Sequence, residues 1–264
     1  MHGSAEVARP PEIARLRPVG RRAGAVTILP GMPRAASVLR LAFGALAVAD
    51  TVLAGMPGPA PERARLVTKS LLMPTLAGSF AIDPRSRRTP LRRSTQAGQA
   101  LGWLGDLALL GSGTGSFLAG MGAFGAGQIA YIRGFRANAN PNPLRHSTVG
   151  KGAAGLFLLT GIPMALGAAR SEPVLGPGVL AYAGLLTTMA DCAAHLDPAL
   201  PEDARRAAAL GGLAFLTSDT LLGLGHFVLS DPPPILESAV MATYTAAQFL
   251  LAEGALRAAG QSAE

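Results

Sequence analysis

The chain has 264 residues, of which 49% are hydrophobic and only 15% are charged, and it contains 33 glycines. So few charged residues cannot cover the surface of a water-soluble protein of this size. The composition therefore excludes most water-soluble folds and favours a polytopic membrane protein. The net charge of +7 would suggest a nucleic-acid partner only if the basic residues formed one face of a soluble domain, which they do not, so we expect no nucleic acid to bind.

The first 36 residues contain Arg, Pro and Gly without a sustained apolar core. This composition predicts a basic, disordered cytoplasmic tail that touches anionic lipid, and it is a poor match to a secretory signal. Met32 is an alternative start of the chain. A second short cytoplasmic tail is expected over residues 258–264.

Eight apolar segments between the tails are long enough to suggest membrane helices. They cover residues 37–55, 66–82, 96–110, 115–133, 149–169, 174–192, 207–229 and 235–257. Most of their apolar residues are Ala, Leu, Gly and Val, and small residues let membrane helices approach closely. The sequence therefore predicts an all-α domain over residues 37–257, a bundle of about eight transmembrane helices.

The basic residues of the linkers predict the orientation of this bundle, because Lys and Arg accumulate on the cytoplasmic side of membrane proteins. With the N-terminus inside, nineteen of them fall on the inner side, whereas the outer loops hold only Arg63, Arg65 and Arg170. Both termini are therefore expected in the cytoplasm. We expect an integral protein of a bacterial plasma membrane; its oligomeric state stays open.

A faint internal repeat is also present. The third segment contains Gly-Asp-x-x-Leu-Leu-Gly at 105–111, and the seventh contains Ser-Asp-x-Leu-Leu-Gly at 218–223. The helices that follow carry Gly127-Gln128 and Ala247-Gln248. An offset of four helices preserves orientation, so the pattern suggests two parallel four-helix repeats with one acid in each.

Five ionisable residues fall inside the predicted helices, where charges are costly and usually face the interior of the bundle. They are Asp50, Lys69, Asp106, Asp219 and His226. Counting from the predicted ends places the first three at similar depth in the outer half and Asp219 near the middle. His226 follows Asp219 by seven residues, on the same helical stripe and nearer the outer face. We therefore expect one cation and two or three acids to share a cavity that opens outward.

Simpler interpretations compete for some of these charges. Lys69, considered alone, is equally well explained by its side chain reaching toward lipid headgroups. For Asp50 the favoured explanation is helix capping or pairing with Lys69. Glu237 and Glu253 lie in the first and last turns of the final segment, where exposure to water explains them. Asp219 has no membrane surface within easy reach, so a role inside the bundle explains it best.

The remaining polar residues of the helices are uncharged. Gln128, Tyr131, Tyr244 and Gln248 are explained as interhelical hydrogen-bonding groups or as walls of a polar pocket. Tyr244 and Gln248 are four residues apart and share a helical face. The single cysteine and four scattered histidines give no metal-ligand spacing, so we expect no metal or cofactor.

Five motifs in order give the chain a resemblance to a known family. They are Lys69-Ser-Leu-Leu-Met-Pro74, Gly105-Asp106-Leu-Ala-Leu109, Phe117-x-x-Gly120-x-x-x-Phe124-x-x-Gly127-Gln128-x-x-Tyr131, Ser218-Asp219-x-x-Leu222 and Tyr244-x-x-Ala247-Gln248. The set resembles the YhhN-type lysoplasmalogenases, multi-helix membrane proteins whose studied members hydrolyse the vinyl ether bond of lysoplasmalogens. The resemblance spans about residues 37–257 and leaves the basic tail uncovered.

The resemblance implies a reaction in which an acid protonates the alkene carbon and water captures the resulting oxocarbenium ion. The hemiacetal then collapses to a fatty aldehyde and a glycerophospho-base. Two buried carboxylates can divide the acid and base roles because they resist double ionisation. We assign Asp106 and Asp219 to this pair without choosing the acid. Lys69 is expected to bind the lipid phosphate or tune one aspartate, with Gln128, Tyr131, Tyr244 and Gln248 orienting water and headgroup.

The chain departs from the family pattern at two positions. Ser70 stands where the family usually has Pro, and Gln128 stands where it usually has His. Glutamine cannot transfer protons, so a lysolipid-binding relative without catalysis is one alternative. The other is a transporter whose buried acids relay protons or bind a cation. Discontinuous helices around the acids would favour transport, whereas a lipid-sized groove ending at both aspartates would favour a hydrolase.

Overall fold

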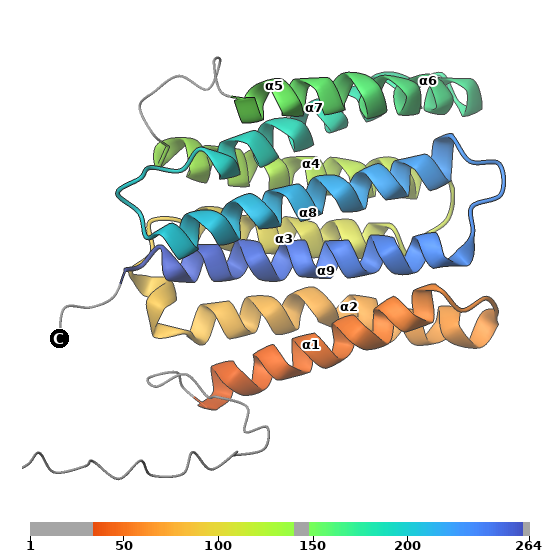
Figure 1. Ribbon diagram of the computed structural model, residues 1–264. Helices are drawn as coiled ribbons and strands as arrows, with labels where there is room; N and C mark the ends of the chain where they lie inside the picture. Colours follow the sequence, from red (N-terminus) through yellow and green to blue (C-terminus); the bar gives the residue numbers. More distant parts are fainter. Residues whose placement is uncertain (1–33, 140–147, 261–264) are drawn as a thin grey trace, which may run out of the picture. The chain divides into compact units, whose positions relative to one another are not determined.

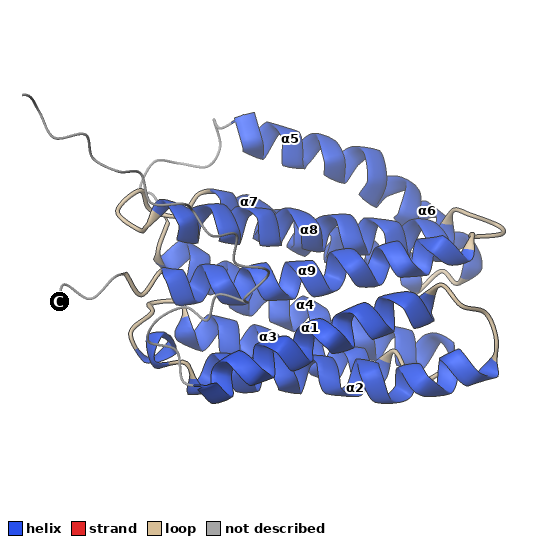
Figure 2. Cartoon of the chain, turned by 60° about the horizontal axis from the view of Figure 1, so that its bottom comes forward, coloured by secondary structure: helices blue, strands red, loops and turns tan. Residues whose placement is uncertain are grey.

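The computed structural model describes residues 34–139 and 148–260, and the regular structure within these ranges is helical (Figures 1 and 2). The helices are α1 (Arg34–Ala54), α2 (Pro59–Ile82), the short 3₁₀ turn η1 (Pro84–Arg87), α3 (Arg92–Ala108), α4 (Gly113–Ala137), α5 (Thr148–Leu156), the π-helical turn η3 (Phe157–Gly161), α6 (Ile162–Ser171), α7 (Leu175–Ala194), α8 (Glu202–Phe227) and α9 (Pro234–Arg257). Residues 1–33 of the predicted basic tail and residues 261–264 of the predicted C-terminal tail lie outside the described residues.

Each of the eight predicted segments corresponds to one helical rod, and the fifth rod consists of α5, η3 and α6 in succession. Four helical stretches are long and apolar enough to cross a membrane: Arg34–Ala54, Ala154–Ser171, Glu202–Phe227 and Pro234–Arg257. The expectation of an all-helical membrane bundle is therefore confirmed. Several helices begin earlier than predicted, because their first turns carry charged residues that interrupt the apolar pattern, as in α2 and α8.

Small residues let α8 and α9 pack at close range, as the composition suggested. A side chain built on Gly211 of α8 would place its Cβ 2.9 Å from the backbone nitrogen of Leu251 in α9. One built on Gly254 of α9 would lie 2.9 Å from the backbone nitrogen of Ala208 in α8. The two backbones therefore approach at both points to distances that exclude any side chain.

Helices adjacent in sequence also pack together: α1 with α2, α3 with α4, α7 with α8 and α8 with α9. The last helix is the most central, because it also contacts α1, α2 and α3, and a long run of its residues from Leu251 to Leu256 is buried. The packing of α3 with α4 and of α8 with α9 agrees with the order of the suggested repeat. The repeat itself stays a prediction.

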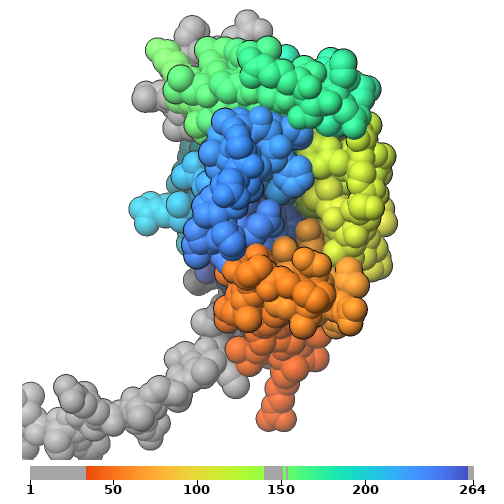
Figure 3. Space-filling model, turned by 90° about the vertical axis from the view of Figure 1, so that its right-hand side faces the viewer, coloured from red at the N-terminus to blue at the C-terminus, as the bar shows by residue number. Residues whose placement is uncertain are grey.

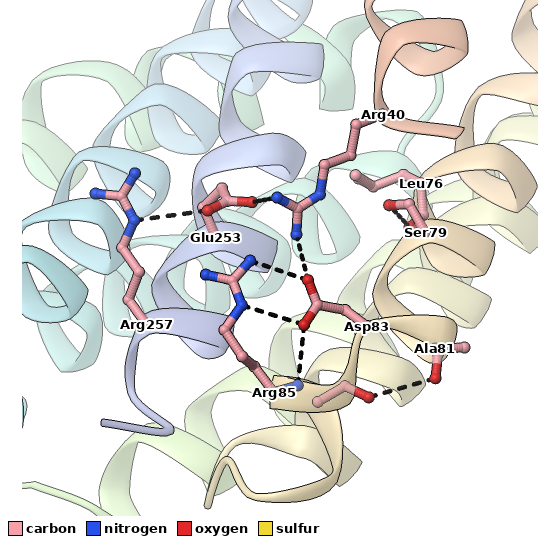
Figure 4. Close-up of polar contacts among 9 residues, drawn as sticks. Arg40, Leu76, Ser79, Ala81, Asp83, Arg85, Glu253 and Arg257 are labelled. Carbon is pink, nitrogen blue, oxygen red and sulfur yellow. Dashed lines mark hydrogen bonds and ion pairs between the residues drawn. The ribbon is translucent and has the colours of Figure 1, made fainter. Parts of the chain in front are cut away.

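An ion network closes one end of the bundle, the end at which α1 begins and α9 finishes (Figures 1 and 4). The guanidinium of Arg40 in α1 lies 2.9 Å from Asp83 Oδ2 and 2.8 Å from Glu253 Oε1. Arg85 Nη2 also lies 2.9 Å from Asp83 Oδ2, and Arg257 Nε lies 3.6 Å from Glu253 Oε2. We call these five residues the basic-end network. It joins α1, η1 and α9.

The expectation that Glu253 is exposed is wrong, because only 6% of it is accessible and it bridges Arg40 and Arg257. Burial alone would raise the pKa of Asp83, at the end of α2. The hydrogen bonds from Arg85 and the charges of Arg85 and Arg40 outweigh burial and hold the pKa of Asp83 below its ordinary value. Asp83 is therefore ionised at neutral pH, and attraction between charges holds this end together.

Candidate active site

A cavity of about 120 Å³ lies between the helices, and both aspartates singled out in the sequence line it. It continues into a vestibule of about 640 Å³ bordered by the first turns of α2 and by the α3–α4 connection. Lys69 and His226 line both spaces, so cavity and vestibule are continuous. Figure 3 looks onto this end of the bundle, which is opposite the basic-end network. The expected cavity, shared by acids and a cation and open at one end, is present.

Asp106 lies in the last turn of α3 and is only 2% accessible. Tyr244 of α9 donates a hydrogen bond to its Oδ2 at 2.6 Å, and Lys69 Nζ of α2 lies 3.9 Å from its Oδ1. The ring of Tyr244 packs edge-to-face against Phe124 and Phe215, with centroid distances of 6.0 and 5.8 Å. Three helices and an aromatic cage thus fix both oxygens of this carboxylate.

A break in the hydrogen bonding of α2 fixes the position of Lys69. Pro74 has no N–H, so it cannot donate to the carbonyl of Ser70 one turn earlier. The indole Nε1 of Trp103 in α3 donates to that carbonyl instead, at 3.0 Å. Ser70 directly follows Lys69, and Trp103 precedes Asp106 by three residues. The hydrogen bond therefore ties the two helices together beside the ion pair.

Asp219 lies within α8 and is partly buried. Tyr182 of α7 donates a hydrogen bond to its Oδ2, and the amide of Gln128 in α4 is hydrogen-bonded to the Tyr182 hydroxyl. Asp106 has the same arrangement, since the amide of Gln248 is hydrogen-bonded to Tyr244. Each aspartate thus ends a glutamine–tyrosine–aspartate series, and the two carboxylates are close enough for their charges to interact.

The residues predicted for the site divide into two layers. Asp106, Asp219, Lys69 and Tyr244 line the cavity. Gln128 and Gln248 are outside its lining, each 1% accessible, and support the two tyrosines from behind. Tyr131 is 2% accessible and stacks on Phe135 with a centroid distance of 5.9 Å, so the structure places it away from the cavity wall.

Asp50 does not pair with Lys69, which was one of the two explanations expected for it. Thr68 Oγ1 donates a hydrogen bond to Asp50 Oδ1 at 2.5 Å, and Arg65 Nε lies 3.7 Å from the same oxygen. Arg65 also reaches Glu237 Oε2 at 3.9 Å. Asp50 is therefore paired with Arg65, and Lys69 is paired with Asp106 instead.

Two residues of this site were not singled out in the sequence. Tyr182 sits in the apolar α7, where the only signal was that the chain has three tyrosines and two of them already belonged to the motifs. Arg65 was counted as an outer-loop charge, yet it lies in α2 and lines both the cavity and the vestibule. His226 is at the mouth, stacked on Phe117 at a centroid distance of 5.6 Å, on the side of Asp219 that the spacing predicted.

The chemistry of this site is that of carboxylates and phenols beside the ammonium of Lys69, with the guanidinium of Arg65 and the imidazole of His226 nearer the mouth. Among the described residues, His, Cys, Asp and Glu form no group of three or more that could hold a metal ion. The rest of the wall is mainly apolar and includes Phe157 of the π-helical turn, Met121 of α4 and Met164 of α6. Such a site can move protons at two fixed carboxylates beside an apolar chain.

The comparison with known families decides the relationship of the chain. A family model described as the YhhN family matches residues 64–255, from α2 to α9. The chain belongs to the YhhN family. No curated protein and no solved structure matches it. The matched range includes both glutamine–tyrosine–aspartate series of this YhhN chain, together with Lys69 and Trp103. Arg40 and Asp50 of α1 precede it.

Proposed function

We propose that the protein is a membrane hydrolase that cleaves the vinyl ether bond of lysoplasmalogens, giving a fatty aldehyde and a glycerophospho-base. The observation that carries this proposal is the meeting of Asp106 and Asp219 in one cavity with a mainly apolar wall. Family membership supports the same reaction. The atoms balance with one water: a proton adds to the alkene carbon, water adds to the oxocarbenium carbon, and the hemiacetal releases the alcohol.

The surroundings of the two carboxylates favour different roles. Asp106 faces the ammonium of Lys69, which stabilises a carboxylate. Asp219 has no cation within 4 Å among the described residues, and Tyr182 occupies only its Oδ2, which leaves Oδ1 for a proton. We therefore assign Asp219 as the acid that protonates carbon. Asp106 stabilises the oxocarbenium ion and accepts a proton from water.

The lining of the cavity and of its vestibule suits a lipid with a single chain. Its wall between α4, α6 and α7 is apolar, with Met121, Met164 and Val179, and suits a hydrocarbon tail. Arg65 and Lys69 line the vestibule, and in this proposal they bind the phosphate at the polar end of such a molecule. Binding a lysolipid this way would bring its vinyl ether, at the junction of tail and headgroup, to the aspartates.

We also propose that the basic-end network faces the cytoplasm. Arg85 and Arg257 belong to this end, together with Arg40, and the excess of cytoplasmic Lys and Arg is the usual guide to topology. The cavity would then open to the outer leaflet of the plasma membrane, and both termini would be inside.

The decisive test is aldehyde release from 1-alkenyl lysophospholipid by the purified protein in detergent or lipid. We expect turnover by the wild type and a loss of at least about 100-fold in Asp106→Asn and in Asp219→Asn, the usual size of an acid–base contribution. Asp231→Asn, in the exposed connection between α8 and α9, is the matched control and should keep full activity. Normal turnover by both site variants would exclude the assignment.

The same assay separates the alternatives. Lysolipid binding without aldehyde release by the wild type would support a non-catalytic relative. Proton or cation flux into proteoliposomes without hydrolysis would support a transporter. The continuity of α8 through Asp219, and of α3 through Asp106 to Ala108, favours a fixed reaction site over the discontinuous helices of many transporters.

A further inference from the structure

Four buried side chains behind the cavity carry polar atoms without a hydrogen-bond partner. They are Gln99 of α3, Gln128 and Tyr131 of α4, and Gln248 of α9, and none is more than 2% accessible. The unpaired atoms are both amide atoms of Gln99, the Oε1 atoms of Gln128 and Gln248, and the hydroxyl of Tyr131. Gln99 is the side chain of this group in which both ends of the amide lack a partner.

The packing of α3 places these side chains at neighbouring levels of the bundle. A Cβ built on Gly102 of α3 would lie 3.3 Å from Gln248 Nε2 and 3.8 Å from the Tyr244 hydroxyl. A Cβ on Gly98, next to Gln99, would lie within 2.3 to 2.8 Å of the Tyr131 ring. Gln99 precedes Asp106 by seven residues on the same helical stripe, so it lies about 10 Å deeper toward the basic end.

Buried polar groups in proteins almost always have partners, and clusters of apparently unpaired groups are where internal water is found. Five such atoms beneath the two aspartates would cost the fold a large part of its stability if they had no partner. Glycine at position 102 keeps a side chain away from Gln248 and Tyr244, because even a Cβ there would lie 3.3 Å from Gln248 Nε2.

We propose that Gln99, Gln128, Tyr131 and Gln248 form an internal water-binding site beneath the two aspartates. Gln128 and Gln248 connect this site to Tyr182 and Tyr244, and hence to both carboxylates. The role of this water, which rests on the proposed function, is to supply the molecule that captures the oxocarbenium ion. The site itself requires no hydrolysis, so it can be tested on the resting protein.

The test is radiolytic hydroxyl labelling of the full chain in lipid nanodiscs and H₂¹⁸O, read by mass spectrometry. Hydroxyl radicals formed from a bound water modify side chains next to it. Tyr131 and its stacking neighbour Phe135 are equally hidden from bulk solvent, with 2% and 3% accessible surface, so Phe135 is the internal control. We expect several-fold faster labelling of Tyr131 than of Phe135. Equal, slow labelling of both rings would overturn the water site.

Two substitutions sharpen the result. Gln99→Leu removes two of the unpaired atoms, and Gly102→Ala adds a methyl group whose tightest contact, 3.3 Å, is with the movable end of Gln248. Each should lower Tyr131 labelling several-fold while Phe135 stays slow, which also reports that the bundle is folded. Unchanged Tyr131 labelling in both variants would overturn the proposal. Aldehyde release is measured separately, so failure of the water site leaves the proposed function intact.

Discussion

At the level of single residues, Gln128 illustrates how a substituted motif position can act through a neighbour. It stands where the family resemblance leads one to expect a histidine, and its amide is hydrogen-bonded to Tyr182 instead of facing the cavity. Its contribution is therefore to orient the phenol that donates to Asp219. A position that orients a tyrosine does not itself need to exchange protons.

We predict that Gln128 and Tyr182 act as one unit on turnover. Gln128→Leu should lower kcat about 2- to 10-fold, the size of one hydrogen bond. Tyr182→Phe should lower it about 10- to 100-fold, because the bond from Tyr182 strengthens when Asp219 gives its proton to carbon and becomes a charged acceptor. The double variant should be no worse than Tyr182→Phe alone. Steady-state kinetics of aldehyde release check this, and additive losses would mean that the two residues act separately.

The sequence was sufficient to find both aspartates, because a carboxylate in an apolar run is conspicuous without any knowledge of the fold. Their tyrosine partners differ in this respect. Tyr244 was found through its motif, whereas Tyr182 pairs with Asp219 across two helices, a contact that periodicity cannot specify. The Arg65–Asp50 pair likewise depends on how α1 meets α2, so spacing alone suggested Lys69.

At the level of helices, the bond between Trp103 and Ser70 determines how α2 presents Lys69 to α3. We predict that Trp103→Phe keeps the ring in place but leaves the Ser70 carbonyl without its donor. Lys69 should then sit less firmly beside Asp106, and kcat should fall about fivefold, which corresponds to one hydrogen bond of about 1 kcal/mol. Leu104→Ala, exposed on the adjacent position of α3, is the control. Equal activity of Trp103→Phe and wild type would contradict this role.

A second prediction at this level concerns the close crossing of α8 and α9. Gly254→Ala would push a methyl group to within 2.9 Å of the Ala208 backbone, and such overpacking costs about 1–3 kcal/mol. The melting temperature should fall by roughly 5 °C. Gly122→Ala of α4, whose Cβ would meet nothing within 4 Å, should leave it unchanged or slightly raised. Thermal unfolding in detergent measures both, and equal melting temperatures would contradict the importance of this crossing.

The lengths of the apolar runs were enough to predict the helical rods. They were not enough to predict where the helices end or where they are irregular. The charged first turn of α2 hid its start, because Glu62, Arg63 and Arg65 resemble a loop in a hydropathy reading. The π-helical turn over Phe157–Gly161 comes just before Pro163, which has no N–H to donate to the carbonyl of Leu159. A hydropathy reading of this apolar run passes over that break.

At the level of the whole molecule, the two ends of the bundle differ in construction. One end is closed by the basic-end network, and the other opens through the vestibule. A reaction site with one opening fits an enzyme that admits and releases its ligands on the same side. The cavity open at one end was predicted from the depth of the ionisable residues along the helices. The basic-end network was not predicted, because Glu253 was expected to be exposed to water.

The charge of Asp83 makes the stability of the closed end depend on pH. Its pKa is lower in the folded protein than in the unfolded chain, so its contribution is fully present above the unfolded value near 4 and is lost as pH falls through the lowered value. We predict that Asp83→Asn lowers the melting temperature at pH 7 and that the difference from wild type shrinks below about pH 4. Asp231→Asn, in an exposed connection, should show no such convergence. A difference that persists unchanged into acid would contradict this.

The indole that holds α2 also gives the protein a built-in optical probe. Trp103 is the single tryptophan of the chain, so all tryptophan emission comes from the immediate neighbourhood of Lys69 and Asp106. Any molecule that enters and displaces the ammonium group will alter the field around that fluorophore. Occupancy can therefore be titrated on the unlabelled protein by its intrinsic emission, even for ligands that undergo no reaction.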